Sequence, residues 1–207
     1  MDKRLIEWSV AQRVLPGQAQ SGDLFVVKEL RSRVLVAVID GLGHGEEAAH
    51  ASQLAAGVLR GYDSSSLISL IRSCHEKLQG TRGAVLSLAE FNGDENTMTW
   101  LGVGNVEGVL LHSDNHVASS QESLLLRGGV LGDHPPRLGA TILSVMKGDT
   151  LILATDGIRS GFADGLKSKE PPQEIADQIV RRHWRGNDDA LVLVARYCHG
   201  NGETKSE

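Results

Sequence analysis

Residues 34–39 form an uninterrupted apolar run, Val-Leu-Val-Ala-Val-Ile, which predicts a β-strand buried on both faces. The run ends in Asp40, and three glycines follow within the next five positions, so backbone can approach a ligand closely there. Acids then open a predicted helix over residues 46–59. The same order of apolar strand, Asp-Gly and a further glycine returns in residues 151–161. The chain therefore twice places a carboxylate at the end of a rigid strand.

Elsewhere the pattern predicts two further helices and many short strands. Apolar positions at helical spacing predict a helix that is capped by Asp63 or Ser64 and ends at Gly80. Another helix is predicted over residues 172–183, with proline near its first turn. Residues 119–137, rich in glycine, predict an irregular connector. Apolar segments between turn clusters predict strands over residues 7–14, 24–30, 33–40, 84–91, 97–103, 107–112, 141–146, 149–155 and 189–197.

The order of these elements indicates an α+β fold. The strands that follow residue 84 are joined by turns too short for a crossover helix, so we expect antiparallel pairing. Apolar strands of this kind predict two mainly antiparallel sheets packed as a sandwich, with helices on both outer faces. We expect a single domain over residues 1–198 and a polar, disordered tail over residues 199–207.

Composition and charge narrow the class of protein. A net charge of −5 over 207 residues, with no large Lys/Arg cluster, argues against nucleic-acid binding. No apolar segment approaches the length needed to span a membrane, and the N-terminus lacks the apolar region of a secretory signal. Cys74 and Cys198 are unrelated in their context, which suits a reducing compartment. We expect a cytoplasmic protein that binds neither nucleic acid nor membrane.

Several acids stand at predicted strand boundaries beside glycine or another acid, namely Asp23, Asp40, Asp156, Asp188 and Asp189. If they converge, ionised carboxylates raise one another's pKa, and protons or cations must relieve the repulsion. Oxygen ligands without histidine or cysteine favour Mg²⁺ or Mn²⁺, in a two-metal site. The alternative is that these acids only cap turns, as Asp-Gly commonly does. Two Asp-Gly copies that each close a buried strand, together with an Asp-Asp pair, favour the metal site.

The ordered set of motifs resembles the metal-dependent serine/threonine protein phosphatases (the PPM or type 2C family) over residues 21–195. The forms after Asp40 and at Asn105 are similar to the bacterial branch that regulates sporulation and stress sigma factors. A catalytic domain of this length without a sensor region is most similar to the phosphatase of the stressosome. The motifs are Gly22-Asp23, Asp40-Gly41, Arg82-Gly83-Ala84, Gly102-Val103-Gly104-Asn105, Asp156-Gly157 and Asp188-Asp189.

The resemblance implies roles for the acids and an αββα fold. Asp40 would bridge two metal ions, and the carbonyl of Gly41 would bind one of them. Asp156 and Asp188 would hold the other ion, while Asp189 would orient the site from behind. Asp40, Asp156 and Asp188 are the expected catalytic residues. The implied mechanism is direct attack on phosphorus by a metal-activated water, with no covalent phosphoenzyme.

The chain departs from the family pattern at a few positions. The histidine that follows Asp-Gly in many eukaryotic members is Leu42 here, and whether His44 reaches the site is open. Asp23, which the resemblance places against a metal-bound water, is preceded by Gly22 where those members have an acid. The second ion would therefore have one protein ligand fewer and bind weakly. A phosphate-gripping arginine is also missing, the nearest in that direction being Arg13.

We therefore expect a Mn²⁺- or Mg²⁺-dependent phosphoserine/phosphothreonine protein phosphatase that acts on stressosome scaffold proteins and resets bacterial stress signalling. Two alternatives stay open: a catalytically impaired pseudophosphatase that serves as a binding module, and a phosphatase of an anti-sigma-factor antagonist. The short span between Asp156 and Asp188 leaves little room for a lid, so we expect an open, shallow cleft that admits a phosphorylated loop. We expect a monomer.

Overall fold

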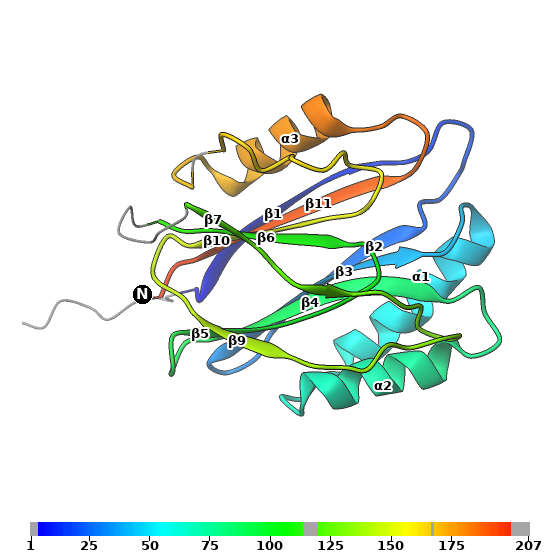
Figure 1. The fold of residues 1–207 in the computed structure, drawn as a ribbon, viewed down its shortest axis with the longest axis horizontal. Helices are drawn as coiled ribbons and strands as arrows, with labels where there is room; N and C mark the ends of the chain where they lie inside the picture. Colours follow the sequence, from blue (N-terminus) through cyan, green and yellow to red (C-terminus); the bar gives the residue numbers. More distant parts are fainter. Residues whose placement is uncertain (1–3, 114–119, 167, 200–207) are drawn as a thin grey trace, which may run out of the picture.

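The chain forms two β-sheets that pack face to face, with helices on both outer faces (Figure 1). The computed structural model describes residues 4–113, 120–166 and 168–199. This arrangement confirms the predicted α+β sandwich. The described elements are β1 (Ile6–Arg13), β2 (Asp23–Glu29), β3 (Arg33–Gly41), α1 (Glu46–Arg60), α2 (Leu67–Leu78), β4 (Ala84–Asn92), β5 (Thr97–Val103), β6 (Glu107–Leu111), β7 (Gln121–Ser123), β8 (Leu126–Arg127), β9 (Thr141–Ser144), β10 (Thr150–Ala154), α3 (Pro172–His183) and β11 (Ala190–Tyr197).

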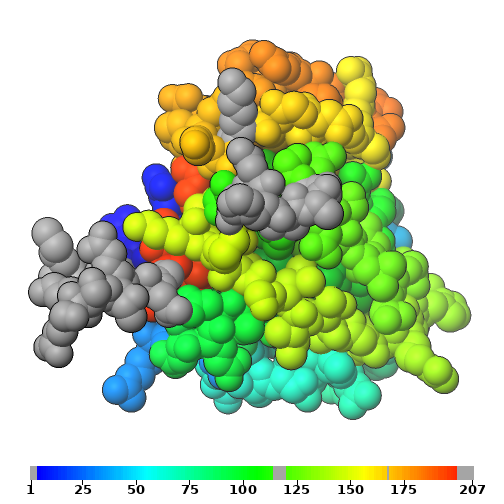
Figure 2. Space-filling model, turned by 60° about the vertical axis from the view of Figure 1, so that its left-hand side comes forward, coloured from blue at the N-terminus to red at the C-terminus, as the bar shows by residue number. Residues whose placement is uncertain are grey.

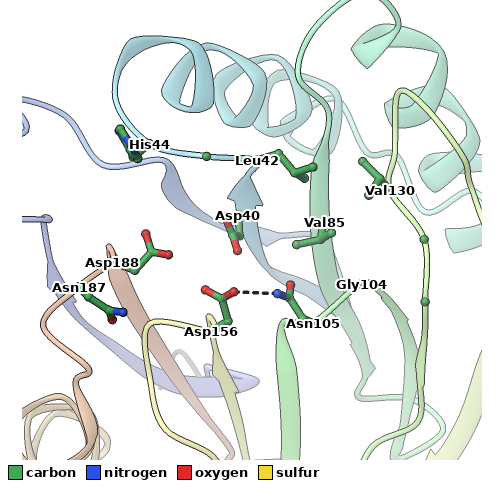
Figure 3. A pocket seen from close by; sticks show the side chains of 13 residues that line it. Asp40, Leu42, His44, Val85, Gly104, Asn105, Val130, Asp156, Asn187 and Asp188 are labelled. Carbon is green, nitrogen blue, oxygen red and sulfur yellow. Dashed lines mark hydrogen bonds between the residues drawn. The ribbon is translucent and has the colours of Figure 1, made fainter.

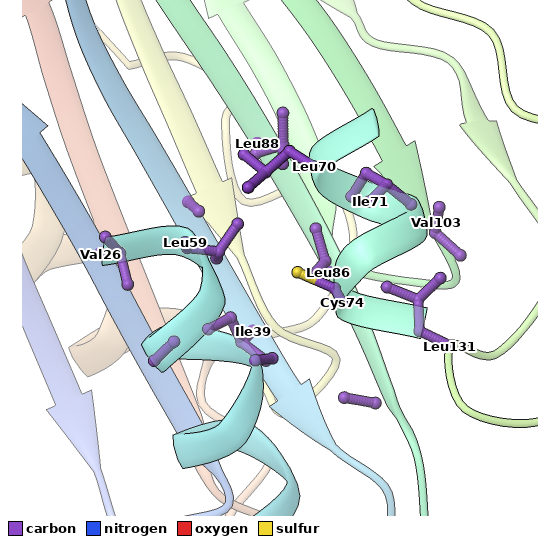
Figure 4. Packing of buried hydrophobic residues seen from close by; sticks show 14 of the residues in the cluster. Val26, Ile39, Leu59, Leu70, Ile71, Cys74, Leu86, Leu88, Val103 and Leu131 are labelled. Atoms are coloured by element: carbon purple, nitrogen blue, oxygen red, sulfur yellow. The ribbon is translucent and has the colours of Figure 1, made fainter. Parts of the chain in front are cut away.

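One sheet has the order β2-β3-β4-β5-β8, with β9 also paired to β5. The apolar run of β3 lies inside it and is buried on both faces, as predicted. Leu35, Ala37 and Ile39 pack into a core beneath α1 and α2, which Figure 4 shows from close by. The alternate residues Val34, Val36 and Val38 pack between the two sheets. Because both faces of β3 meet apolar layers, its sequence shows no alternation of apolar and polar positions.

The other sheet has the order β1-β11-β10-β6-β7. Its strand β11, like β3, meets apolar layers on both faces. Leu191 and Leu193 face the core between the sheets, whereas Val192 and Val194 face α3. The helix α3 buries Ile175, Ala176, Ile179 and Val180 against this sheet. Figure 2 shows α3 (orange) and α2 (teal) at opposite ends of the molecule, with the yellow-green segment that precedes β10 between them.

The start of α2 differs from the prediction. The helix begins at Leu67, with Ser66 as its N-cap residue and no hydrogen bond from a capping side chain. Asp63 instead accepts a hydrogen bond from the backbone of Ser65 at 3.2 Å, while Ser64 takes a positive φ of 74°. Asp63 therefore stabilises a turn before the helix rather than the helix itself.

The segment predicted as an irregular connector is partly ordered into strands. It contributes β7, which pairs with β6, and β8, which pairs in parallel with β5. The parallel pair is the exception to the expected antiparallel pattern. The strand predicted over residues 141–146 ends at Ser144, and beyond it the Met146 amide donates to the Asp149 carboxylate at 2.9 Å.

Two expectations about the whole chain stay predictions. The polar tail is described only at His199, since residues 200–207 lie outside the described residues. The single-domain boundary stays a prediction. Within the described ranges, no helix is both long and apolar enough to cross a membrane.

Candidate active site

The ends of strands from both sheets meet at one edge of the sandwich, where they surround a pocket of about 520 Å³. Asp40 comes from the end of β3, in one sheet. Asp156 follows β10 and Asp188 precedes β11, and these two strands are antiparallel neighbours in the other sheet. Figure 3 shows the three carboxylates in the same pocket. The structure thus brings together the three residues whose catalytic role the family resemblance implies.

The pocket is open to solvent. Asp156, Asn105, His44 and Asn187 all line it and are exposed residues. This arrangement agrees with the expected open cleft.

Asp23 lies behind the pocket rather than in its lining. It pairs with Asp40 across β2 and β3, and only 2% of its surface is exposed. The Thr155 hydroxyl donates to the Asp23 Oδ2 at 2.8 Å and accepts a hydrogen bond from the Leu191 amide at 2.9 Å. Thr155 directly follows β10 and Leu191 lies in β11, two strands of the opposite sheet, so this chain of hydrogen bonds ties the two sheets together directly beneath the site.

Asp189 is also buried, with 3% of its surface exposed. Its Oδ1 accepts a hydrogen bond from the Leu15 amide and its Oδ2 accepts one from the Gly22 amide, both at 2.7 Å. The carboxylate therefore fixes the connection between β1 and β2, which leads into Asp23. Its proposed role of orienting the site from behind stays a prediction, and these contacts give that role a physical basis.

Both Asp-Gly motifs need glycine for packing. A Cβ on Gly41 would lie 2.1 Å from the carbonyl oxygen of Ala48 in α1, and one on Gly157 would lie 1.8 Å from the carbonyl oxygen of Asp189. Backbone from another element thus presses on each glycine, a constraint that the sequence does not reveal. Gly41 does not line the pocket, and its role as a backbone ligand stays a prediction.

Asp40 and Asp23 are held in an environment that disfavours their ionised form. Burial, and then the charges of Asp23, Asp156 and Asp188, raise the pKa of Asp40 to about 9. Burial also raises the pKa of Asp23 to about 7, although the hydrogen bond from Thr155 opposes the shift. No described residue donates a hydrogen bond to the Asp40 carboxylate. Its partly buried charge is therefore left for a proton or a cation to neutralise.

The donor set fits a hydrated hard cation. The three acids that line the pocket offer only oxygen, which suits Mg²⁺ or Mn²⁺. In the described part of the chain, no three His, Cys, Asp or Glu side chains lie close enough together to hold an ion among them. Mg²⁺ commonly keeps several waters and takes only one or two protein carboxylates. The residues therefore fit ions bound partly through water, not ions enclosed by protein ligands.

Comparison with known proteins decides the family. The family model described as Stage II sporulation protein E (SpoIIE) matches residues 31–197. The chain belongs to the SpoIIE family. It is a phosphatase domain of the PP2C (PPM) type, which confirms both the resemblance and the prediction of a protein serine/threonine phosphatase.

Individual relatives of this SpoIIE-family chain support the assignment. Phosphoserine phosphatase RsbX of Bacillus subtilis (strain 168) is 28% identical over 194 residues, which span 92% of this chain and 94% of RsbX. A structure of RsbX in complex with magnesium aligns with a TM-score of 0.82 and 25% identity, over 93% of this chain and 95% of that one. A chain from structural work on the bacterial stressosome aligns with a TM-score of 0.82 and 29% identity, over 92% and 99% of the two chains.

Two residues of the pocket have positions that the sequence did not predict. The amide of Asn105 donates from Nδ2 to the Asp156 Oδ2 at 2.9 Å, so Asn105 orients a carboxylate across the site (Figure 3). His44, whose reach was open, lines the pocket. Burial raises the pKa of Asp188, and the positive charge of protonated His44 opposes that shift. Leu42 also lines the pocket, and Arg13 does not.

Proposed function

We propose that this SpoIIE-family phosphatase hydrolyses phosphoserine or phosphothreonine in folded proteins and depends on Mn²⁺ or Mg²⁺ held at Asp40, Asp156 and Asp188. The observation that carries the proposal is the charge of the pocket. Among its described lining residues are three carboxylates, and neither arginine nor lysine. A phosphate group would be repelled by such a surface, so cations must be present before the substrate can bind.

The residues of the chain then have distinct tasks. Asp40, Asp156 and Asp188 would hold the cations, with Asn105 fixing one carboxylate in orientation. Bound there, two cations would neutralise the phosphoryl oxygens and supply an activated water for in-line attack. Thr155 holds Asp23 in place through a direct hydrogen bond. The second ion would bind weakly, because Gly22 stands where a further acid could serve as a ligand.

The substrate proposal rests on the relatives. The similarity to RsbX and to a chain from the stressosome supports phosphorylated stressosome scaffold proteins as substrates. The complex of RsbX with magnesium supports the divalent cation. We further propose that the chain acts as a monomer in the cytoplasm, where its dephosphorylation of the scaffold would reset stress signalling.

The test is release of phosphate from a phosphorylated stressosome scaffold protein, with Mn²⁺ and with a chelator. We expect turnover with Mn²⁺ and none with the chelator. Asp40→Asn should abolish turnover, whereas the matched change Asp177→Asn, at an exposed acid of α3, should leave it unchanged. Equal turnover by the Asp40→Asn protein would contradict the assigned site.

The second candidate is a pseudophosphatase that only binds phosphoproteins, and the apolar Leu42 in the pocket is the observation that favours it. In that case the scaffold protein would bind tightly and keep its phosphate under both conditions. Turnover on a phosphorylated anti-sigma-factor antagonist, but not on the scaffold protein, would instead identify the third class of function.

A further inference from the structure

The pocket has two chemically different sides (Figure 3). The carboxylates of Asp40 and Asp156 lie on one side. The side chains of Leu42, Val85 and Val130 lie on the opposite side, and we name these three residues the apolar wall. Hydrolysis of a phosphate monoester requires only the carboxylate side, so the proposed chemistry leaves the apolar wall without a role.

Backbone hydrogen bonds build the apolar wall as an extension of a sheet. The Leu42 amide donates to the carbonyl of Gly83 at 3.1 Å. Ala84 and Leu131 exchange two hydrogen bonds, of 3.1 and 2.9 Å. Three chain segments far apart in sequence are thereby fixed side by side. The wall is consequently preformed and does not depend on ligand for its shape.

The wall offers apolar surface and no polar partner. Val85 is 7% exposed, and Leu42 and Val130 are partly buried, since all three pack on the core between the sheets. The charged side chains that line the pocket, among the described residues, are the three acids and His44, when it is protonated. The three side chains of the wall offer no hydrogen bond, so a polar substrate side chain that rests on them would lose water without compensation from the wall itself.

Space is also available for more than a phosphate group. The pocket of about 520 Å³ is of the size that accommodates drug-sized ligands, for which about 300–1,000 Å³ is usual. A Cβ placed on Gly128, which also lines the pocket, would meet no atom within 4 Å, so the space at this part of the lining is open.

We propose that the apolar wall is a substrate subsite for an aliphatic side chain directly next to the phosphorylated residue. The inference rests on the proposed function, because a phosphate held at the carboxylates places the neighbouring residue of the substrate over the wall. The occupant is a phosphoprotein segment in which leucine, isoleucine, valine or methionine adjoins the phosphoserine or phosphothreonine. Contact between that side chain and the wall selects such segments over those with a polar neighbour.

The test compares phosphoserine peptides that differ only in the neighbouring residue. Leucine is compared with asparagine, which is similar in size, first before and then after the phosphoserine. We expect kcat/KM with Mn²⁺ to favour leucine on at least one side by on the order of tenfold, as for small apolar contacts in other enzymes. Val130→Thr, which keeps the side-chain shape, should bring the ratio towards one. Ile142→Thr, at a residue of β9 that is 69% exposed and outside the pocket, should preserve it.

Two further measurements separate the subsite from the proposed function. Hydrolysis of p-nitrophenyl phosphate with Mn²⁺, which needs no neighbouring side chain, reports the phosphatase activity itself and should be the same in wild type and Ile142→Thr. Binding of the same peptides with a non-hydrolysable phosphonate in place of the phosphate, followed with Mn²⁺ by fluorescence anisotropy, should favour leucine in wild type and lose that preference in Val130→Thr. Equal affinity for the two peptides, or a preference that survives Val130→Thr, would overturn the subsite even if hydrolysis is observed. Absence of all hydrolysis would overturn the proposed function, while the binding data alone would then decide the subsite.

Discussion

Thr155 connects the two sheets through its hydroxyl, and replacing it with valine tests how much that connection matters. The side chain is buried, donates to Asp23 and accepts from the Leu191 amide. Valine keeps the shape and removes both hydrogen bonds. The Leu191 amide would then lack a partner, which costs about 1–3 kcal/mol, and the hydrogen bond to the Asp23 carboxylate would also be lost. We therefore expect the free energy of unfolding to fall by about 2–4 kcal/mol in total. For a chain of this size that is roughly a 5–15 °C fall in Tm.

The assay is thermal unfolding of Thr155→Val and Thr155→Ser in chelator, followed by titration with Mg²⁺. Thr155→Ser keeps the hydroxyl and should lose only about 1 kcal/mol for its missing methyl group. We also expect weaker Mg²⁺ binding in the valine protein and near-normal binding in the serine protein, because Asp23 loses its fixed orientation only in the first. The same Tm and the same Mg²⁺ affinity for both proteins would refute the reasoning.

Two other predictions follow from the site. Gly41→Ala should strongly reduce stability, because its Cβ would lie 2.1 Å from a backbone oxygen of α1. Gly57→Ala within α1 has free space for its Cβ, so it should raise the free energy of unfolding, measured in urea, by about 0.5–1 kcal/mol. Comparable curves for the two alanine proteins would contradict this account. The pKa values of Asp40 and Asp23 are raised in the folded state from their ordinary value of 3.8 to about 9 and about 7. Between these ordinary and raised values, the folded protein in chelator binds more protons than the unfolded protein. The free energy of unfolding should therefore fall as the pH rises through that window. Unfolding from pH 5 to pH 8 should show this fall in wild type and a smaller one in Asp40→Asn, and parallel curves would exclude Asp40 as its source.

Local sequence was sufficient for the elements whose signals lie within themselves. The apolar run of β3 and the proline-initiated helix α3 were predicted with bounds that match the structure within a residue. The strands β7 and β8 were missed, since they are three and two residues long and exist only because β6 and β5 pair with them. Such strands depend on partners distant in sequence, which no periodicity within residues 119–137 could indicate.

The same limit applies to the candidate site. Asp40, Asp156 and Asp188 could be grouped from sequence, because each stands beside the end of an apolar strand. Asp23 and Asp189 carry the same kind of signal, yet they face inward. The difference lies in tertiary contacts, with Thr155 for Asp23 and with two backbone amides for Asp189. A motif that marks a strand end does not specify on which side of that end the carboxylate lies.

The two Asp-Gly motifs show how packing and chemistry are joined in this fold. The glycine at 41 admits the backbone of α1, and the glycine at 157 admits the backbone of Asp189. A side chain at either glycine would push away the element that packs there, and the preceding carboxylate would move with it. Close contacts between uncharged backbone groups thus help to position Asp40 in one sheet and Asp156 at the end of a strand in the other. We therefore expect a side chain at either glycine to change the separation of the carboxylates across the pocket.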